Sequence, residues 1–475
     1  MKLSKANSPL PDLRALVREG SVHFMGMGGA GMCALAELLL SRGGSVTGCD
    51  LKDSQSIQDL AELGVDVSMG HDSCHVRNAS ALVVTSAVPY DHPELIAARE
   101  LNIPVLKRAE ALGAWVNKGR VIAISGTHGK TTTTAMATEI LVQGGLDPTG
   151  LVGGRVHGWS GNLRRGSDDL FVVEADEYDR SFHTLTPDIA VVTNVEADHL
   201  DVYGDYQGVQ AGFIRFLDNL RAPGKVIACA DDHGSASLLS RFGDLGYSYG
   251  TTAGSMLRAV DVTITEDSTD CFVMEDGELV GRLSVSMGGI HNLRNALGSA
   301  AVARVLDTPW PAIFDALSGF KGIGRRLECL GKRCRVVVLD DYAHHPTEIR
   351  ATLDTARKMY PSARLVAAFQ PHLFSRTRDF SEDFGVALAR ADSVWVTDVF
   401  AAREHPIPGI TGQTVVEAVE KAGSKHTRYV PELDELTNLL AEELREGDVL
   451  VTLGAGSIEN LGNQVLKQLG EGVHA

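Results

Sequence analysis

Short β-branched runs alternate with amphipathic helical stretches along almost the whole chain. This alternation is typical of parallel sheets covered by helices on both faces, because a parallel strand needs a crossover to reach its neighbour. We therefore predict an α/β fold with mainly parallel sheets, and a helix over residues 346–359. Residues 61–67 are interpreted as part of a connection, and residues 255–287 show the period of two that favours antiparallel strands.

A chain of 475 residues is too long for one hydrophobic core, and its 44% apolar content is enough for two or three. Changes in the strand and helix pattern near residues 117–119 and after the loop at residues 319–326 divide the chain further. We predict three domains, over residues 1–119, 120–324 and 325–475. Each is of ordinary domain size.

The chain is acidic, with 44 Lys and Arg against 61 Asp and Glu and a net charge of −17. It has no run rich in lysine or arginine, so the basic surface that attracts nucleic acid or an anionic membrane is not expected. An anionic ligand would have to be held by local positive groups.

The seven cysteines are scattered, and their number is odd, which favours a reducing compartment. Cys329 and Cys334 are close in sequence, but no second pair or nearby histidine completes a zinc spacing. The N-terminal residues have no apolar run of signal-peptide length, and no later run has the length of a membrane span. We predict a cytoplasmic protein that does not insert into membranes.

The first of two glycine loops lies within residues 22–40, between a strand-like run and a helical run. Gly26, Gly28 and Gly31 give G-x-G-x-x-G, in which glycine lets the backbone approach a diphosphate at the positive end of a helix. Asp50 closes the next strand, where an acidic side chain can bond ribose hydroxyls. The pattern predicts a phosphorylated ligand, and leaves an NAD(P) oxidoreductase and a ligand-free turn as alternatives.

The second loop is SGTHGKTTTT at residues 125–134. Its backbone amides can cradle phosphate, Lys130 can reach the terminal phosphates, and Thr131 can ligate Mg²⁺. The common P-loop would need glycine where Ile124 stands, so the loop is either a chance match or the mark of a distinct nucleotide-binding family. The preceding strand and the four threonines favour the second interpretation.

Acidic residues and a histidine follow two further strand-like runs. Glu174, Asp176 and Glu177 end one run, and His199 follows the next. Because open α/β sheets bind ligands at the carboxyl ends of their strands, we expect these side chains to support a phosphate-bound metal ion. The alternative is a solvated acidic turn and a surface histidine.

With these residues in view, the sequence resembles the Mur ligase family over essentially its whole length. The resemblance rests on GMGGAGM, SGTHGKTTTT, EADEYDRSF, NVEADHLDVYG, GIHNLRNA, GFKGIGRRLE, DDYAHHPTEI and FQPHLFSRT, which occur in the family's order. It implies a Rossmann-like domain that binds a UDP-sugar, a central P-loop-type ATPase domain, and a Rossmann-like last domain that closes over the nucleotide and the amino acid. The branch that the sequence most resembles joins L-alanine to UDP-N-acetylmuramate during peptidoglycan precursor synthesis, with ATP and Mg²⁺.

The resemblance also implies the residues of each site. For the UDP-sugar these are Gly26, Gly28, Gly29, Ala30, Gly31, Asp50, His71 and Ser86. For ATP they are Gly126, Thr127, Gly129, Lys130, Thr131, Thr132, His291, Asn292, Asn295, Arg326 and Asp341. For the metal ion they are Thr131, Glu174 and His199, and for L-alanine they are Tyr342, His344, His372 and Arg376.

The implied chemistry is amide formation through an acyl phosphate. Bringing a carboxylate up to the γ-phosphate sets two anions against each other, and Lys130, Mg²⁺ and Arg326 would offset that repulsion. His199 would orient the carboxylate. His344 or His372, whose side-chain type titrates near neutral pH, would deprotonate the alanine ammonium, with water or phosphate as further possibilities.

The sequence departs from the family pattern in three places: at the pair Leu373 and Phe374, at Tyr178, and at Ser457. Many relatives have arginine and tyrosine at the first pair, so one cation near the amino acid is missing here. A ligase for a preformed tripeptide, a dehydrogenase and a catalytically idle nucleotide-binding scaffold are the alternative functions. The expected partners are small-molecule substrates, and the expected assembly is a monomer or homodimer.

Overall fold

The computed structural model describes residues 11–85, 88–159, 161–265, 268–402 and 404–471. These residues form three sheets flanked by helices, which confirms the predicted α/β class. The contacts within the chain define two compact units, one made of residues 1–262, 270–286 and 292–321, and the other of residues 263–269, 287–291 and 322–475. Among the described residues, no helix is long and apolar enough to cross a membrane.

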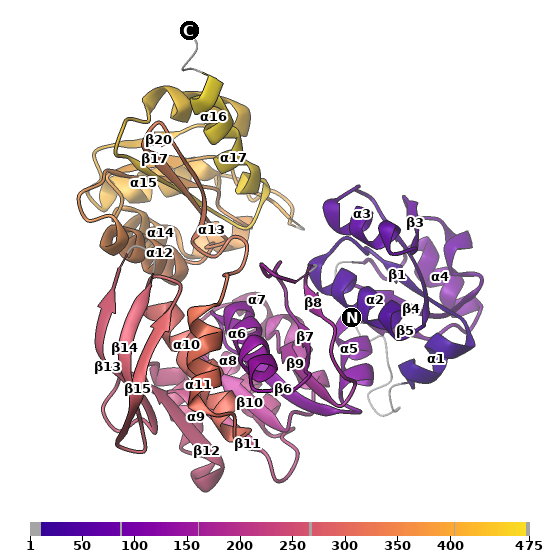
Figure 1. Cartoon of the computed structure of the whole chain (residues 1–475). Coiled ribbons are helices and arrows are strands. Elements are labelled where there is room, and N and C mark those ends of the chain that lie inside the picture. The colour runs from indigo at the N-terminus through magenta and orange to yellow at the C-terminus, as the bar shows by residue number, and fades with distance from the viewer. Residues whose placement is uncertain (1–10, 86–87, 160, 266–267, 403, 472–475) are drawn as a thin grey trace. The chain divides into compact units, whose positions relative to one another are not determined.

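The first sheet has five parallel strands in the order β3-β2-β1-β4-β5 (Figure 1). The strands are β1 (Ser21–Met25), β2 (Ser45–Asp50), β3 (Asp66–Met69), β4 (Ala79–Val84) and β5 (Val105–Lys107). The helices are α1 (Leu13–Glu19), α2 (Ala30–Ser41), α3 (Gln55–Glu62), α4 (Pro93–Glu100) and α5 (Arg108–Val116), with a 3-10 turn η1 (Ser73–Val76). The strand order reverses at β1, so the loop after β1 lies at the switch point where such sheets bind ligands.

The strand β3 corrects one sequence prediction. Residues 61–67 were expected to form a connection, but Asp66 already begins β3. This strand lies at the sheet edge and none of its residues is buried, so it lacks the apolar run by which a strand is recognised.

The second sheet has ten strands in the order β15-β14-β13-β12-β11-β10-β6-β9-β7-β8. They are β6 (Arg120–Ser125), β7 (Thr149–Leu151), β8 (Leu163–Arg164), β9 (Leu170–Glu174), β10 (Ile189–Val192), β11 (Lys225–Cys229), β12 (Gly246–Gly250), β13 (Leu257–Ile264), β14 (Thr269–Glu275) and β15 (Glu278–Val285). The α-helices of this part are α6 (Lys130–Gln143), α7 (Leu200–Tyr203), α8 (Tyr206–Leu217), α9 (His233–Leu239), α10 (Ile290–Val305) and α11 (Trp310–Ser318). The 3-10 turns are η2 (Tyr178–Thr184) and η3 (Gly243–Leu245). Strands β10, β6 and β9 lie side by side and run parallel.

The predicted antiparallel section corresponds to β13, β14 and β15. Only Asp276 and Gly277 connect the neighbouring strands β14 and β15, and their φ angles are 50° and 88°. Positive φ at both central residues is the requirement of a type I′ hairpin, which joins antiparallel strands. The period of two in this section therefore indicated β14 and β15 correctly.

The third sheet has six strands in the order β16-β17-β21-β18-β19-β20, parallel except for the β16 and β17 pair. The strands are β16 (Glu328–Arg333), β17 (Val336–Asp341), β18 (Leu365–Phe369), β19 (Ser393–Val396), β20 (Thr427–Tyr429) and β21 (Val449–Leu453). The helices are α12 (Pro346–Met359), α13 (Phe374–Asp379), α14 (Ser381–Leu388), α15 (Gly412–Lys421), α16 (Leu433–Glu443) and α17 (Leu461–Glu471), with a 3-10 turn η4 (Ser457–Asn460). The helix predicted over residues 346–359 is α12, which begins with proline at its first position, where the missing N–H costs nothing.

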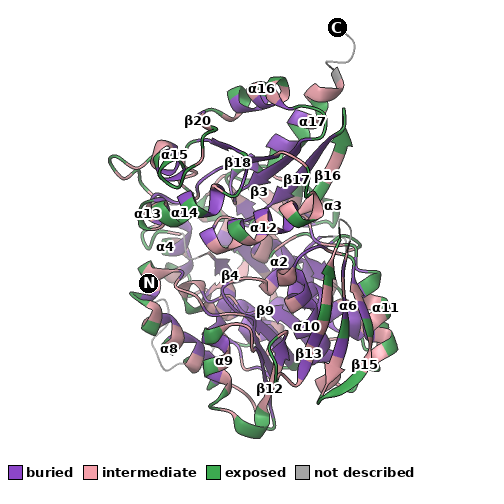
Figure 2. Ribbon diagram, turned by 90° about the vertical axis from the view of Figure 1, so that its left-hand side faces the viewer, coloured by how far each residue is buried: buried purple, intermediate pink, exposed green. Residues whose placement is uncertain are grey.

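Each sheet has a buried interior, drawn in purple in Figure 2. In the second sheet, Val121 to Ile124 of β6 are fully buried. The helix α6 that follows is buried almost all round, and its four threonines, Thr131 to Thr134, are all buried. The lysine loop therefore connects two rigid elements, and its backbone is held in place from both ends.

Candidate active site

The lysine loop joins β6 to α6 and depends on two glycines. Gly126 has a φ of 136° and Gly129 a φ of 83°, angles that side chains other than glycine rarely adopt. A Cβ at Gly126 would press on Thr193, and one at Gly129 would press on Asn295. The loop therefore has the tight backbone that a phosphate cradle needs.

The Lys130 ammonium turns back onto its own loop. It donates to the carbonyl oxygen of Gly126 at 2.7 Å and lies 2.8 Å from Oε2 and 3.0 Å from Oε1 of Glu177. Burial alone would lower the pKa of Lys130, but the carboxylates of Glu177, Asp176 and Glu174 outweigh it and raise that pKa. The lysine is therefore charged and held beside the loop.

Glu177 was predicted only as a member of the acidic cluster and not among the residues assigned to a particular ligand. It is 2% exposed, and burial raises the pKa of its carboxyl to about 7, against the attraction of Lys130. Its Oε1 lies 3.6 Å from Nε2 of His199, and its backbone carbonyl accepts a 2.6 Å hydrogen bond from the Tyr203 hydroxyl. Glu177 thus connects the phosphate-loop lysine to the histidine.

The three predicted metal ligands follow three adjacent strands. Thr131 comes after β6, Glu174 ends β9, and His199 follows β10. Oε1 of Glu174 accepts a 2.9 Å hydrogen bond from the Gly153 amide. His199 has a φ of 53°, and its amide donates to Asp198 Oδ1 at 2.7 Å. All three residues therefore lie at the carboxyl edge of the sheet, as predicted.

Thr127, Thr132 and Asn295, which were also predicted to bind ATP, lie within the lysine loop or beside it. Thr127 Oγ1 accepts a 2.9 Å hydrogen bond from the Glu196 amide, and Thr132 is buried in the first turn of α6. Asn295 Oδ1 lies 3.3 Å from Thr133 Oγ1, which fixes α10 against α6. Asn292 is buried one turn earlier in α10, while His291 belongs to the second compact unit.

The first glycine loop joins β1 to α2. Gly26 has a φ of 79°, Gly29 precedes α2, and Ala30 and Gly31 form its first turn. The Gly28 amide donates to Oδ2 of Asp50 at 2.8 Å, so the structure brings these two predicted residues together.

Two further residues were predicted for the UDP-sugar. Nδ1 of His71 lies 3.2 Å from Sγ of Cys49, the residue that precedes Asp50. Ser86, the last residue predicted for this ligand, lies outside the described residues.

In the second unit, Arg326, Asp341 and Tyr342 lie together at the end of β17. The Arg326 guanidinium carbon is 5.3 Å from the centre of the Tyr342 ring, a cation–π distance. Asp341 accepts from the amides of Leu327 and Ala343 at 2.7 and 2.8 Å. Burial raises the pKa of Asp341 to about 6, although Arg326 opposes the shift.

The residues predicted to bind L-alanine form a continuous series of contacts. Ring centres of Tyr342 and His344 are 5.2 Å apart, and those of His344 and His372 are 5.8 Å apart. Arg376, which is 7% exposed, has Nη1 at 3.4 Å from Nδ1 of His372. Two segments of the chain, around residues 342–344 and 372–376, therefore bring these four residues together in the second unit.

Glu348 is a second residue that the sequence analysis did not assign. Its Oε2 accepts from the His344 amide at 3.0 Å and lies 3.5 Å from His344 Nδ1, and its Oε1 is 4.0 Å from Arg326 Nη1. Its position in the sequence was the signal that could have identified it. Glu348 lies three residues after His345, the N-cap of α12, and this is the position that glutamate takes in a capping box.

The fold and these groups define an α/β protein with a lysine-containing loop of the kind that can hold a nucleotide phosphate. The Mur ligase catalytic-domain model matches residues 21–120, the Mur ligase middle-domain model matches residues 124–303, and the model of the Mur ligase glutamate ligase domain matches residues 325–456. The chain belongs to the Mur ligase family.

Curated relatives and solved structures agree with this assignment. The chain is 41% identical to the UDP-N-acetylmuramate–L-alanine ligase of Geobacter sp. strain M21, over 94% of this chain and 97% of that protein. It is 42% identical to the ligase of the same name from Salinibacter ruber, over 94% of each. The crystal structure of the UDP-N-acetylmuramate–alanine ligase of Thermotoga maritima is 27% identical, with a TM-score of 0.82 over 95% of this chain and 100% of that one.

Proposed function

We propose that this chain joins L-alanine to the lactyl carboxylate of UDP-N-acetylmuramate in an ATP-dependent reaction, giving UDP-N-acetylmuramoyl-L-alanine, ADP and phosphate. The observation that carries the proposal is the 41% identity to a UDP-N-acetylmuramate–L-alanine ligase over 94% of the chain. The product is a precursor of peptidoglycan.

The lysine loop gives the proposal its phosphate chemistry. Lys130, which the structure holds charged and close to the loop, would exchange its contacts with Gly126 and Glu177 for the terminal phosphates of ATP. Thr131, Glu174 and His199 would hold Mg²⁺, since a hydroxyl and a carboxylate are oxygen donors that suit this ion and the phosphates supply further ones. When bound, Mg²⁺ neutralises negative charge on the phosphates.

Arg326 and the carboxylate of the sugar nucleotide complete the first step of the proposed reaction. The lactyl carboxylate attacks the γ-phosphate in line, ADP leaves, and an acyl phosphate forms. Arg326 would stabilise the charge on the transferred group, and His199 would orient the attacking carboxylate. The alanine amine then attacks the acyl carbon, and phosphate leaves.

Two histidines were candidates for accepting the alanine proton, and their surroundings favour His344. His344 Nδ1 lies 2.9 Å from the Tyr342 carbonyl oxygen, to which it donates, so Nε2 carries the lone pair. The nearby Glu348 carboxylate stabilises an imidazolium, whereas the Arg376 guanidinium beside His372 opposes one. We assign proton removal to His344, and alanine positioning to His372, Tyr342 and Arg376.

The remaining assignments follow the resemblance and the first glycine loop. Gly26 to Gly31 would hold the UDP diphosphate at the start of α2, with Asp50, His71 and Ser86 near the uridine. His291, Asn292 and Asn295 would contact the adenine, and Asp341 the ribose. We further propose small-molecule substrates only, a cytoplasmic location, a monomer or homodimer, and functional domains over residues 1–119, 120–324 and 325–475.

This proposal is tested by measuring the release of phosphate from ATP in the presence of Mg²⁺, with the masses of the products measured in parallel. UDP-N-acetylmuramate is combined in separate reactions with L-alanine, glycine, L-serine and the L-Ala-D-Glu-meso-diaminopimelate tripeptide. Dependence on the sugar nucleotide and preference for L-alanine supports the proposal. Turnover with the tripeptide alone would favour the alternative of a ligase for a preformed tripeptide. A protein that turns over no acceptor would be an idle scaffold.

A further inference from the structure

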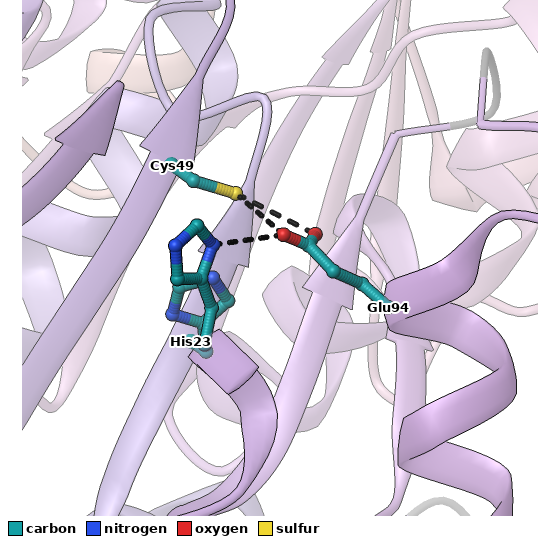
Figure 3. A group of neighbouring side chains, drawn as sticks. His23, Cys49 and Glu94 are labelled. Atoms are coloured by element: carbon teal, nitrogen blue, oxygen red, sulfur yellow. Dashed lines mark hydrogen bonds and ion pairs between the residues drawn. The ribbon is translucent and has the colours of Figure 1, made fainter. Parts of the chain in front are cut away.

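Four side chains that the proposed reaction does not use converge in the first domain. His23 comes from β1, Cys49 from β2, His75 from η1 and Glu94 from α4. Each offers one potential metal-ligand atom, and these atoms all lie within 4.8 Å of one another. Figure 3 shows His23, Cys49 and Glu94 pointing toward a common centre.

Glu94 is a buried carboxylate whose ion-pair partners are histidines. The residue is 0% exposed, and its closest contacts are His75 Nδ1 at 2.9 Å and the Asp72 amide at 3.0 Å. Cys49 Sγ follows at 3.5 Å from both carboxylate oxygens, and His71 Nδ1 at 3.6 Å. Among the described residues, no lysine or arginine pairs with it. Since a buried carboxylate is costly without an opposite charge, this position calls for a cation.

His23 supplies a second, independent sign of a ligand. It is 2% exposed, its Nδ1 lies 2.9 Å from the Thr47 hydroxyl, and its buried Nε2 has no hydrogen-bond partner within the described part of the chain. An imidazole that donates through Nδ1 carries its lone pair on Nε2, which is how a metal-binding histidine is oriented by an outer partner.

The types of the four ligand atoms indicate which metal ion the site would bind. We propose that His23, Cys49, His75 and Glu94 form a four-coordinate Zn²⁺ site. Two imidazole nitrogens, a thiolate and a carboxylate are the ligand types that zinc binds in tetrahedral sites, whereas Mg²⁺ and Ca²⁺ take oxygen ligands. One thiolate and one carboxylate balance the two charges of the ion, and the Cys49 thiol proton is released to solvent on binding.

The ion would stabilise the base of the first glycine loop. The Cys49 carbonyl oxygen accepts from the amides of Gly26 and Met27, at 2.9 and 3.1 Å. Fixing the Cys49 side chain therefore fixes the end of β2 against the turn that follows β1. The site is structural, and it stands independently of the reaction proposed above.

Metal analysis of the whole chain tests the proposal. The purified protein is stripped with a chelator, reloaded with Zn²⁺ or Co²⁺, and measured by elemental analysis, visible absorption and thermal unfolding. We expect one ion per chain, a Co²⁺ spectrum of tetrahedral intensity with a thiolate charge-transfer band, and a higher unfolding temperature with Zn²⁺. A folded protein that binds no stoichiometric ion would overturn the proposal.

Variants locate the ion. Cys49→Ser should abolish the charge-transfer band and weaken Zn²⁺ binding by at least about a hundredfold, and Thr47→Val, which removes the outer partner of His23, should weaken it by roughly tenfold. Cys229→Ser, at another buried cysteine, is the matched control and should bind like the wild type. If Cys49→Ser and His23→Gln are folded by circular dichroism and bind Zn²⁺ as tightly as the control, the ion lies elsewhere and the proposal is wrong.

Discussion

The Lys130 ammonium lies 2.8 Å from one carboxylate oxygen of Glu177 and 3.0 Å from the other, within a buried site. Glu177 therefore holds the lysine of the phosphate loop when no nucleotide is bound. Because ATP phosphates would compete with Glu177 for the same ammonium, this pair connects the stability of the ligand-free protein to its proposed chemistry.

Removing the lysine should abolish turnover while sparing the sugar nucleotide. In Lys130→Ala, the rate of phosphate release is expected to fall by at least about a thousandfold, because the ammonium that would contact the transferred phosphoryl group is lost. The affinity for UDP-N-acetylmuramate, measured by calorimetry, should change less than about twofold. Lys118→Ala, at a partly exposed lysine paired with Asp12, makes the same change in charge and should be fully active. An active Lys130→Ala protein would refute the role of the loop.

Breaking the buried pair should destabilise the ligand-free protein. Glu177→Gln leaves the Lys130 ammonium, whose side chain is 16% exposed, without its charge partner, at a cost of about 3 kcal/mol in the free energy of unfolding. Adding Lys130→Met to that variant should restore part of the loss, because the uncompensated charge is then gone. Denaturant unfolding of the wild type, Glu177→Gln, Lys130→Met and the double variant gives the coupling energy. Strictly additive losses would mean that the two side chains do not interact.

Arg376 should determine the affinity for the amino acid. Its replacement in Arg376→Lys keeps the charge but loses the paired hydrogen bonds to the alanine carboxylate, so KM for L-alanine should rise by roughly tenfold or more. KM for ATP should be unchanged. Arg378→Lys lies in the same helix at an exposed position and serves as the control. Equal effects of both variants on KM for L-alanine would argue against the assignment.

The two histidines should differ in the parameter that they control. His344→Asn removes the proposed proton acceptor, and kcat should fall by about a hundredfold or more. His372→Asn should act mainly on KM for L-alanine, because its assigned role is to position the substrate. Steady-state kinetics over a range of pH distinguishes the two effects, and the reverse pattern would move the base to His372.

Asp341 should make the stability of the protein depend on pH. Its pKa of about 6 in the folded state lies above the ordinary 3.8, so the folded state binds more protons between these values. Its contribution to stability is therefore fully present below about pH 4 and is lost as the pH rises through 6, by up to about 3 kcal/mol. The difference in unfolding free energy between wild type and Asp341→Asn should follow this curve, and a constant difference from pH 4 to pH 7.5 would contradict it.

Elements with a strong periodic pattern were predictable from the sequence. The strand β6, the loop after it and the helix α12 lie where the sequence placed them, because apolar runs and a proline at the helix start mark their limits. The strand β3 was missed because no residue in it is buried. The positive φ angles of Asp179 and Arg180 within η2 have no sequence signal, since neither residue is one that the conformation requires.

Side-chain partnerships were harder to predict than the elements that carry them. Glu177 was visible as one of three neighbouring carboxylates, but its role depends on which of them the Lys130 side chain reaches. The group of His23, Cys49, His75 and Glu94 has no motif spacing, and it forms only when four separate elements pack together. Such groups are set by tertiary structure, and sequence spacing alone does not reveal them.

The acyl-phosphate reaction is tested most directly by following the oxygen atoms of the lactyl carboxylate into the products. UDP-N-acetylmuramate labelled with ¹⁸O in its lactyl carboxylate is converted with ATP and L-alanine, and the released phosphate is analysed by mass spectrometry. If the carboxylate attacks the γ-phosphate, one labelled oxygen leaves with the phosphate and the other stays in the new amide. Phosphate without label, formed at the same rate as the amide product, would contradict the proposed reaction.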